Sequence, residues 1–288
     1  MNKIHRRAFL KTTATGLGGA LLFSQIPQQV SGAARFAGIP IGFQTWPVKD
    51  VLAKDFAGTL KNIAALGYEQ VEMCSPKGYE KMGFGALAQM KVSDMRNVIR
   101  DAGLSCPSSH FTMAEFADDV LDDRIEFAKC LGMKHMICSS LGLPKTALLS
   151  DYLAKADSLN KAAVKIKKAG LQAGFHNHSI EFVQLDGRLI YDALLERFDP
   201  DLVKLQFQTE VINLGFKGAP YLNKFPGRFI SAHLSDWTAD KKEVPVGKGI
   251  INWKEFFDAA KQSGVQTYFV EMAPATYKES AAYIRSLR

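Results

Sequence analysis

The feature that most constrains the fold of this 288-residue chain is a repeated unit of amphipathic helix, glycine and short apolar strand. Expected helices at 55–66, 93–102, 121–131, 151–169 and 253–263 are each followed directly by a glycine. Glycine readily adopts the left-handed conformation with which many helices end. Runs rich in β-branched and aromatic residues alternate with these helices, which is typical of parallel strands joined by crossover helices.

The sequence predicts eight strands. They are expected at 39–45, 68–73, 104–110, 135–140, 171–177, 203–209, 228–234 and 267–271. A polar residue near the end of each strand recurs every 25 to 38 residues, from Gln44 to Glu271, and one βαβ step needs about 30 residues. Eight such steps with no Pro/Ser-rich linker predict one α/β domain over 34–288, a closed (β/α)8 TIM barrel. The alternative is an open doubly wound sheet.

The N-terminus is interpreted separately because targeting segments mimic structure. The pair Arg6-Arg7 precedes an apolar, glycine-rich run at 14–26, which is typical of a twin-arginine signal peptide. This run is shorter than the roughly 20 apolar residues of a membrane span, and small residues at 31–34 offer a cleavage site. We therefore expect a signal peptide at 1–33, a twin-arginine translocase as export partner, and a periplasmic protein with no stable membrane span once mature. The alternative is a retained N-terminal anchor.

Net charge argues against a nucleic acid-binding protein, and cysteine spacing argues against a metal site made of cysteines. Segment 1–33 holds four of the 36 basic residues and none of the 29 acidic ones, so the net charge falls from +7 to 32 − 29 = +3 without it. Such a balance does not indicate a nucleic acid partner. The four cysteines lack metal-type spacing, so we expect buried free thiols, although an oxidising compartment leaves one disulfide open.

Ionisable residues gather at the predicted carboxyl ends of the strands. They are Glu72, His110, His176, His178, His233 and Glu271. In a (β/α)8 barrel these ends form the mouth at which sites are built. So many ionisable groups on one rim indicate a site for a charged or polar ligand.

Five segments in order carry a family resemblance. They are 67–72 (GYEQVE), 176–182 (HNHSIEF), 232–236 (AHLSD), 246–253 (VGKGIINW) and 269–271 (FVE). Together they resemble the sugar phosphate isomerase/epimerase family, whose members have a xylose isomerase-like barrel. The resemblance extends through the whole mature chain.

The resemblance implies a divalent metal held at the barrel mouth by a glutamate, an aspartate, a histidine and a glutamate. His233 and Glu271 match the last two, whereas His176 and Gln208 stand in place of the first two. Imidazole favours Mn, Zn or a similar ion over Mg²⁺, and Glu210, two residues beyond Gln208, could supply a carboxylate. The alternative is a pocket that has lost its metal.

The resemblance also implies proton abstraction next to a carbonyl, for which Glu271, His176 and Glu72 are the candidate catalytic residues. The candidate substrate-binding residues are His110, His178, Glu181, Trp46 and Lys248. We therefore expect an exported isomerase or epimerase of a small carbohydrate. The alternatives are a keto-glycoside lyase or hydrolase using the same proton abstraction, and a non-catalytic sugar-binding protein.

Overall fold

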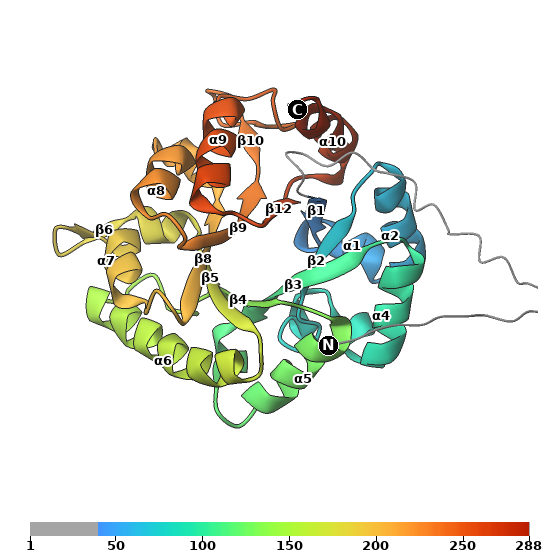
Figure 1. The fold of residues 1–288 in the computed structure, drawn as a ribbon, viewed down its shortest axis with the longest axis horizontal. Helices are drawn as coiled ribbons and strands as arrows, with labels where there is room; N and C mark the ends of the chain where they lie inside the picture. Colours follow the sequence, from blue (N-terminus) through green and yellow to red (C-terminus); the bar gives the residue numbers. More distant parts are fainter. Residues whose placement is uncertain (1–39, 288) are drawn as a thin grey trace, which may run out of the picture. The chain divides into compact units, whose positions relative to one another are not determined.

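The computed structural model describes residues 40–287, which contain a closed barrel of eight parallel strands (Figure 1). Around the barrel the strands follow the order β1-β2-β3-β4-β5-β8-β9-β12. Their bounds are β1 Ile41–Gln44, β2 Gln70–Cys74, β3 Ser105–Thr112, β4 His135–Ser140, β5 Gln172–His176, β8 Val203–Gln208, β9 Phe229–Leu234 and β12 Thr267–Val270. All eight predicted strands are present with ends shifted by at most two residues, so the predicted (β/α)8 fold is confirmed.

The five predicted helices are also present. They are α2 Phe56–Ala65, α4 Val92–Asp101, α5 Leu121–Leu131, α6 Leu149–Lys168 and α9 Trp253–Ser263. The glycine that follows each of them has a φ between 76° and 97°. That conformation is strained for residues with a Cβ atom, which is why glycine marks these ends.

Several elements were not predicted. They are α1 Lys49–Leu52, α3 Gly85–Ala88, α7 Ile190–Arg197, α8 Gly218–Lys224, α10 Tyr277–Ser286, the hairpin strands β6 Gln184–Leu185, β7 Arg188–Leu189, β10 Asp236–Trp237 and β11 Glu243–Val244, and the 3₁₀ segments η1 Trp46–Val48, η2 Glu80–Met82, η3 Met113–Phe116, η4 Ser179–Phe182, η5 Thr209–Leu214 and η6 Pro274–Thr276. The missed helices lack the glycine signal: α8 carries Pro220 within its first turn, and α10 ends close to the last residue of the chain.

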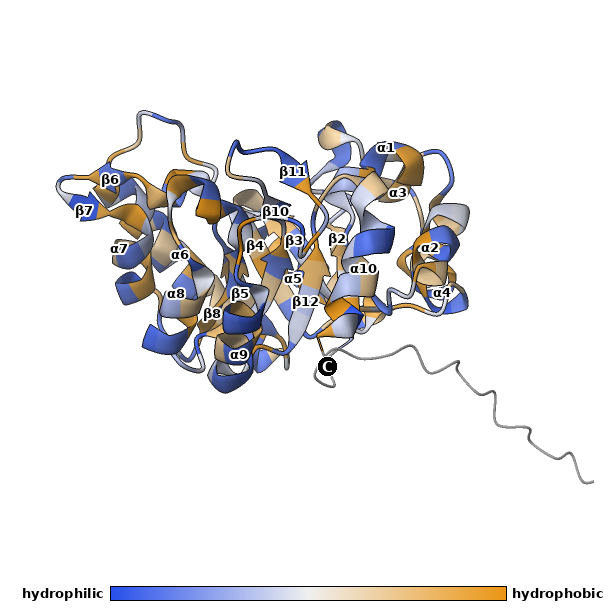
Figure 2. Cartoon of the chain, turned by 90° about the horizontal axis from the view of Figure 1, so that it is seen from above, coloured by the Kyte–Doolittle hydropathy of each residue, from blue (hydrophilic) through white to orange (hydrophobic). Residues whose placement is uncertain are grey.

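The apolar core lies between the barrel and the ring of helices. Strand side chains such as Phe43, Phe175 and Phe207 are fully buried there, and Figure 2 shows the polar colours mainly on the outer faces of the helices. Phe43 packs against the rings of Tyr68 and Tyr277. Because side chains alternate along a strand, the opposite positions fill the barrel interior, and many of them are polar.

The remaining predictions on organisation have different outcomes. The predicted signal peptide at 1–33 lies outside the described residues. Within residues 40–287, no helix is long and apolar enough to cross a membrane. The four cysteines are free thiols, of which three are buried and Cys130 is half-buried.

Candidate active site

A cavity of about 1190 Å³ opens at the carboxyl ends of the barrel strands. Every strand end or the segment that follows it contributes to its wall, from Trp46 after β1 to Glu271 after β12. Below the cavity, the barrel interior carries a buried polar floor, defined here as Glu72, His110, His176, His233 and the side chains bonded to them. The site is therefore an open chamber above a buried ionisable cluster.

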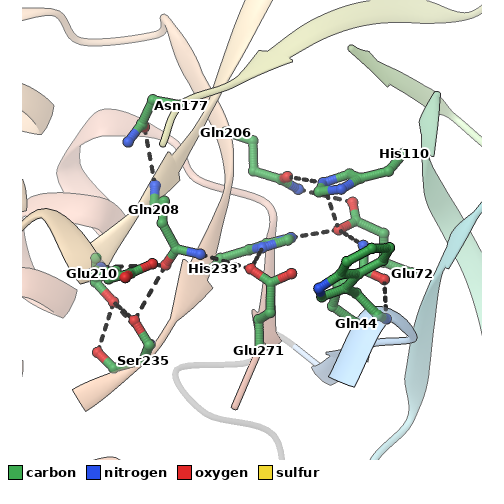
Figure 3. A network of polar contacts seen from close by, with 12 residues as sticks. Gln44, Glu72, His110, Asn177, Gln206, Gln208, Glu210, His233, Ser235 and Glu271 are labelled. Atoms are coloured by element: carbon green, nitrogen blue, oxygen red, sulfur yellow. Dashed lines mark hydrogen bonds and ion pairs between the residues drawn. The ribbon is translucent and has the colours of Figure 1, made fainter. Parts of the chain in front are cut away.

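Glu72, from β2, is the centre of the floor and is fully buried (Figure 3). Its Oε1 atom accepts hydrogen bonds from Ser108 Oγ at 2.5 Å and Gln206 Nε2 at 2.8 Å. Its Oε2 atom accepts one from Gln44 Nε2 at 3.0 Å and contacts His233 Nε2 at 2.5 Å. Burial opposes ionisation, but the neighbouring His110 and His233 outweigh it and lower the pKa of Glu72 to about 2.

His233, from β9, lies between two carboxylates. While its Nε2 atom contacts Glu72, its Nδ1 atom lies 2.8 Å from Glu271 Oε2. Burial opposes protonation of this imidazole, but Glu271 and Glu72 outweigh it and raise the pKa of His233 to about 9. In this arrangement the ring is an imidazolium that links the buried floor to Glu271.

Glu271 reaches the cavity wall, with 17% of its side chain exposed, whereas the side chains of Glu72 and His233 are 0% exposed. Its Oε2 atom also accepts a hydrogen bond from Gln208 Nε2 at 2.7 Å. Burial raises the pKa of Glu271, but His233 outweighs this effect and holds it below the usual value. Glu271 is thus an ionised carboxylate held against the cavity.

The histidines of β3, β5 and β9 form one packed group. Their ring centroids lie 4.5 to 5.0 Å apart, and the rings of His110 and His233 are stacked. Nitrogen atoms of His110, His176 and His233 all lie within 4.8 Å of one another, so these three residues could hold a metal ion. His110 Nε2 also contacts Gln206 Oε1 at 2.7 Å.

His176 is fully buried, yet both of its ring nitrogens lack a hydrogen-bond partner. Buried polar atoms without a partner are costly, so a water molecule or an ion bound at these nitrogens would stabilise the site. Burial, together with His233, His178 and His110, holds the pKa of His176 well below its usual value, so its imidazole is neutral. A neutral imidazole with free nitrogens fits a transition-metal ligand.

The structure does not place all four predicted metal ligands in the histidine group. His176 and His233 belong to that group, whereas Gln208 and Glu271 lie beside it. Gln208 Oε1 accepts weak hydrogen bonds from Ser235 Oγ and the Glu210 amide, both at 3.3 Å. Gln208 and Glu271 bond to each other beside the histidine group, whereas His110, interpreted as a substrate-binding residue, lies within that group. The cluster suited to an ion therefore contains His110, His176 and His233.

The candidate substrate-binding residues separate into two groups. Trp46, His110 and His178 line the cavity, and burial lowers the pKa of His178 to about 4. Glu181 is buried away from the cavity wall, and its carboxylate accepts a hydrogen bond from the His178 backbone N–H at 2.7 Å. The Lys248 side chain is exposed and is not part of the wall. Neither Glu181 nor Lys248 therefore faces a ligand in the cavity.

The loop that contains Lys248 encloses an internal carboxylate. Asp236 is fully buried. Its oxygens accept hydrogen bonds from Trp237 N at 3.0 Å, Gly247 N at 2.9 Å, Gly249 N at 3.0 Å, Ile251 N at 3.4 Å and Trp253 Nε1 at 2.7 Å. A Cβ atom on Gly249 would lie 2.1 Å from Asp236 Oδ1, so only glycine fits there. The glycines on either side of Lys248 thus serve this carboxylate.

Sequence reasoning missed Gln44 as a floor residue, together with Ser108 and Gln206. The signal that could have found them is alternation along a strand, since Ser108 precedes His110 by two residues and Gln206 precedes Gln208 by two. Such pairs point into the same barrel interior, one layer apart.

Comparison with known proteins places this barrel in a family. Residues 60–287 match the xylose isomerase-like TIM barrel family. The chain belongs to this family. No match was found among curated proteins.

Solved structures of xylose isomerase-like barrels resemble the chain over most of its length. A sugar phosphate isomerase/epimerase from Parabacteroides distasonis is 25% identical, with a TM-score of 0.74 over 89% of this chain and 98% of its own. An L-ribulose 3-epimerase is 16% identical, with a TM-score of 0.61 over 86% of this chain and 94% of its own. The IOLI protein with a bound zinc atom is 13% identical, with a TM-score of 0.61 over 86% and 95%. The last two likenesses show the fold alone.

Proposed function

We propose that this xylose isomerase-like barrel is a sugar isomerase or epimerase that removes a proton next to a carbonyl. The observation that carries the proposal is the chain Glu271–His233–Glu72, which joins a cavity-facing carboxylate to a buried ionisable floor. The resemblance to a sugar phosphate isomerase/epimerase over nearly the whole of both chains supports it.

Glu271 is the proposed base because it is ionised and faces the cavity. His233 holds the Glu271 carboxylate in place through its Nδ1 atom and offsets its negative charge. Gln208 Nε2 holds the same oxygen from the other side. A carboxylate fixed in this way is positioned to take a proton from a substrate carbon and return it.

His176 and Glu72 have indirect roles in this account. Both side chains are fully buried and neither is part of the cavity wall, so neither contacts a ligand in the cavity directly. Glu72 keeps His233 oriented through the contact with its Nε2 atom, and His176 is a candidate metal ligand. His178 lines the cavity and is the proposed partner for sugar hydroxyl groups.

The buried cluster fits a divalent ion of the Mn or Zn type. His110, His176 and His233 supply imidazole nitrogens, and Glu72 adds a carboxylate beside His110 and His233, at 3.3 and 2.5 Å. Glu271 on His233 Nδ1 then matches the carboxylate that commonly orients a metal-bound histidine. A bound ion would polarise the carbonyl oxygen of the substrate.

Exchange with solvent deuterium tests the proposed reaction. The protein is incubated in D₂O with a panel of keto-sugars and aldoses, and proton NMR follows deuterium incorporation next to the carbonyl. We expect incorporation for the wild type and for the matched control Glu279→Gln, an exposed carboxylate on α10, and a loss of at least about 100-fold for Glu271→Gln, the size expected of general base removal. Equal rates for the two variants would contradict the role of Glu271.

We also propose export by the twin-arginine route, on the Arg6-Arg7 pair and the apolar run that follows it. A folded barrel can take up its ion in the cytoplasm before transport. The double substitution of Arg6 and Arg7 by lysine should leave the protein in the cytoplasm on cell fractionation, whereas the wild type should be periplasmic. Identical fractionation of the two proteins would contradict this route.

A further inference from the structure

The cavity wall is divided into two chemically different halves. Large apolar side chains line it from the end of β1 to the end of β4: Trp46, Tyr79, Met82, Met113, Phe116 and Leu141. From the end of β8 to the end of β12 the wall carries all of its acidic side chains and one amide, Gln208, Glu210, Glu243 and Glu271, with Trp237 and Met272 among them. His178 and Lys155 lie between the two halves along the rim. Hereafter these are the apolar wall and the acidic wall.

The apolar wall presents surface to the cavity that nothing in the described chain covers. Trp46 is 37% exposed and Met82 is 40% exposed, although both line the cavity. Covering such surface with an apolar group stabilises a complex by about 25 cal/mol per Å². These two side chains therefore favour an apolar partner over water.

Trp46 is held in place rather than loosely exposed. Its backbone N–H donates a hydrogen bond to Gln44 Oε1 at 3.0 Å. The edge of the Tyr79 ring packs against its ring at a centroid distance of 6.0 Å, and Lys49 Nζ lies 4.2 Å from the ring centroid. A fixed indole loses little conformational freedom when a flat group packs against it.

The acidic wall offers the complementary chemistry. Glu210 and Glu271 present carboxylates to the cavity beside the amide of Gln208. Carboxylate oxygens accept hydrogen bonds from several hydroxyl groups at once. This half suits a polyhydroxylated ring placed above the buried floor.

The size of the cavity leaves room for a ligand that contacts both walls. Its volume of about 1190 Å³ exceeds the roughly 300–1,000 Å³ of typical small-molecule sites. A single sugar ring held at the acidic wall would leave the apolar wall in contact with water. The space therefore fits a sugar together with a second, apolar group.

We propose that the ligand is a keto-glycoside, with its carbonyl-bearing sugar ring at the acidic wall and an apolar or aromatic aglycone against Trp46 and Met82. The sugar half of this inference rests on the proposed function, whereas the aglycone half rests on the apolar wall alone. The inference deepens the proposed function because it names the substrate class that the same cavity accepts.

Paired glycosides test the inference. Titration calorimetry compares the phenyl and methyl glycosides of D-glucose, D-galactose, D-mannose and D-xylose in both anomeric forms, so that only the aglycone differs within a pair. We expect at least one phenyl glycoside to bind about tenfold or more tightly than its methyl partner, a size consistent with burial of one aromatic ring. Trp46→Ala and Met82→Ala should each reduce that ratio, to about threefold or less for Trp46→Ala. The control Ile250→Ala, an exposed apolar side chain outside the cavity, should leave it unchanged.

Three results would overturn the inference: phenyl to methyl ratios below about threefold in every pair, absence of binding by all pairs, or binding of phenol alone as tightly as the phenyl glycoside. The proposed function fails separately. A phenyl preference without deuterium exchange in any carbonyl sugar retains the glycoside site and rejects the isomerase. Exchange in free keto-sugars without a phenyl preference retains the isomerase and rejects the glycoside.

Discussion

Replacement of Asp236 by asparagine tests whether one buried carboxylate holds the loop that contains Lys248 in place. Three donors share its Oδ2 atom: Gly247 N at 2.9 Å, Gly249 N at 3.0 Å and Trp253 Nε1 at 2.7 Å. Asparagine has the same shape, but one of its oxygens becomes an NH₂ group that cannot accept a hydrogen bond. Asp236→Asn therefore places a donor against donors, whichever way the amide is turned.

The magnitude follows from the number of donors left without an acceptor. Each buried donor that loses its partner costs about 1–3 kcal/mol, and movement of the loop relieves part of that cost. The amide takes the orientation that leaves fewer donors unpaired, with its oxygen at the Oδ2 position, so the two donors on Oδ1, Trp237 N and Ile251 N, lose their acceptor. We expect Asp236→Asn to lower the free energy of unfolding by about 2–4 kcal/mol.

Urea unfolding followed by circular dichroism measures this difference. Asp240→Asn is the matched control, because Asp240 lies on the same loop but is exposed and pairs with the exposed Lys242. It should change the free energy of unfolding by less than about 0.5 kcal/mol. A change below about 1 kcal/mol for Asp236→Asn, or equal changes for both variants, would refute the reasoning.

Three further results are expected. Burial raises the pKa of Glu181 to about 7, so as pH rises from about 4.5 to 7 the unfolded chain loses this proton before the folded protein does, and the wild type loses stability. The free energy of unfolding of Glu181→Gln should therefore rise by up to about 3 kcal/mol relative to that of the wild type across this window. A difference between the two proteins that does not depend on pH would contradict this expectation. Lys248→Ala should leave sugar affinity within about twofold in calorimetry, because the side chain is exposed outside the cavity; a tenfold loss would show that the loop contacts the ligand. Because Glu271 and Glu72 raise the pKa of His233 to about 9, binding of Zn²⁺ at pH 7 should release about one proton from His233. In calorimetry the measured binding enthalpy should then vary with the ionisation enthalpy of the buffer. A binding enthalpy that is the same in all buffers would exclude His233 as a ligand.

The strands and most helices of the barrel were predictable because their signals are local. Buried parallel strands read as apolar runs, and five helices end at glycines that the backbone requires at positive φ. The short helices α7 and α8 were missed because no such glycine follows them and because α8 carries Pro220 in its first turn. Local signals thus define a (β/α)8 frame but not all of its insertions.

The sequence predicted which residues lie at the carboxyl ends of the strands, but not how deep each side chain lies in the barrel. Strand ends correctly gathered the histidines and Glu72 at one end of the barrel, since parallel strands share that end. Whether a side chain lines the cavity or lies in the floor depends on strand stagger and register, which one sequence does not reveal. This is why, from the sequence, His110 was assigned to substrate binding and His176 and His233 to the metal, and why Lys248 was offered as a substrate-binding residue.

Metal analysis of the purified protein tests the central claim that His110, His176 and His233 hold a divalent ion in the buried floor of the site. Elemental analysis after incubation with Mn²⁺ or Zn²⁺ and removal of free ion should find about one ion per chain in the wild type and very little in His176→Ala. The control is His135→Ala, because His135 is also a buried histidine but lies at the amino end of β4, away from the cavity. This variant should retain the ion. A wild type without bound ion, or a His176→Ala variant that binds as much as the wild type, would contradict the account.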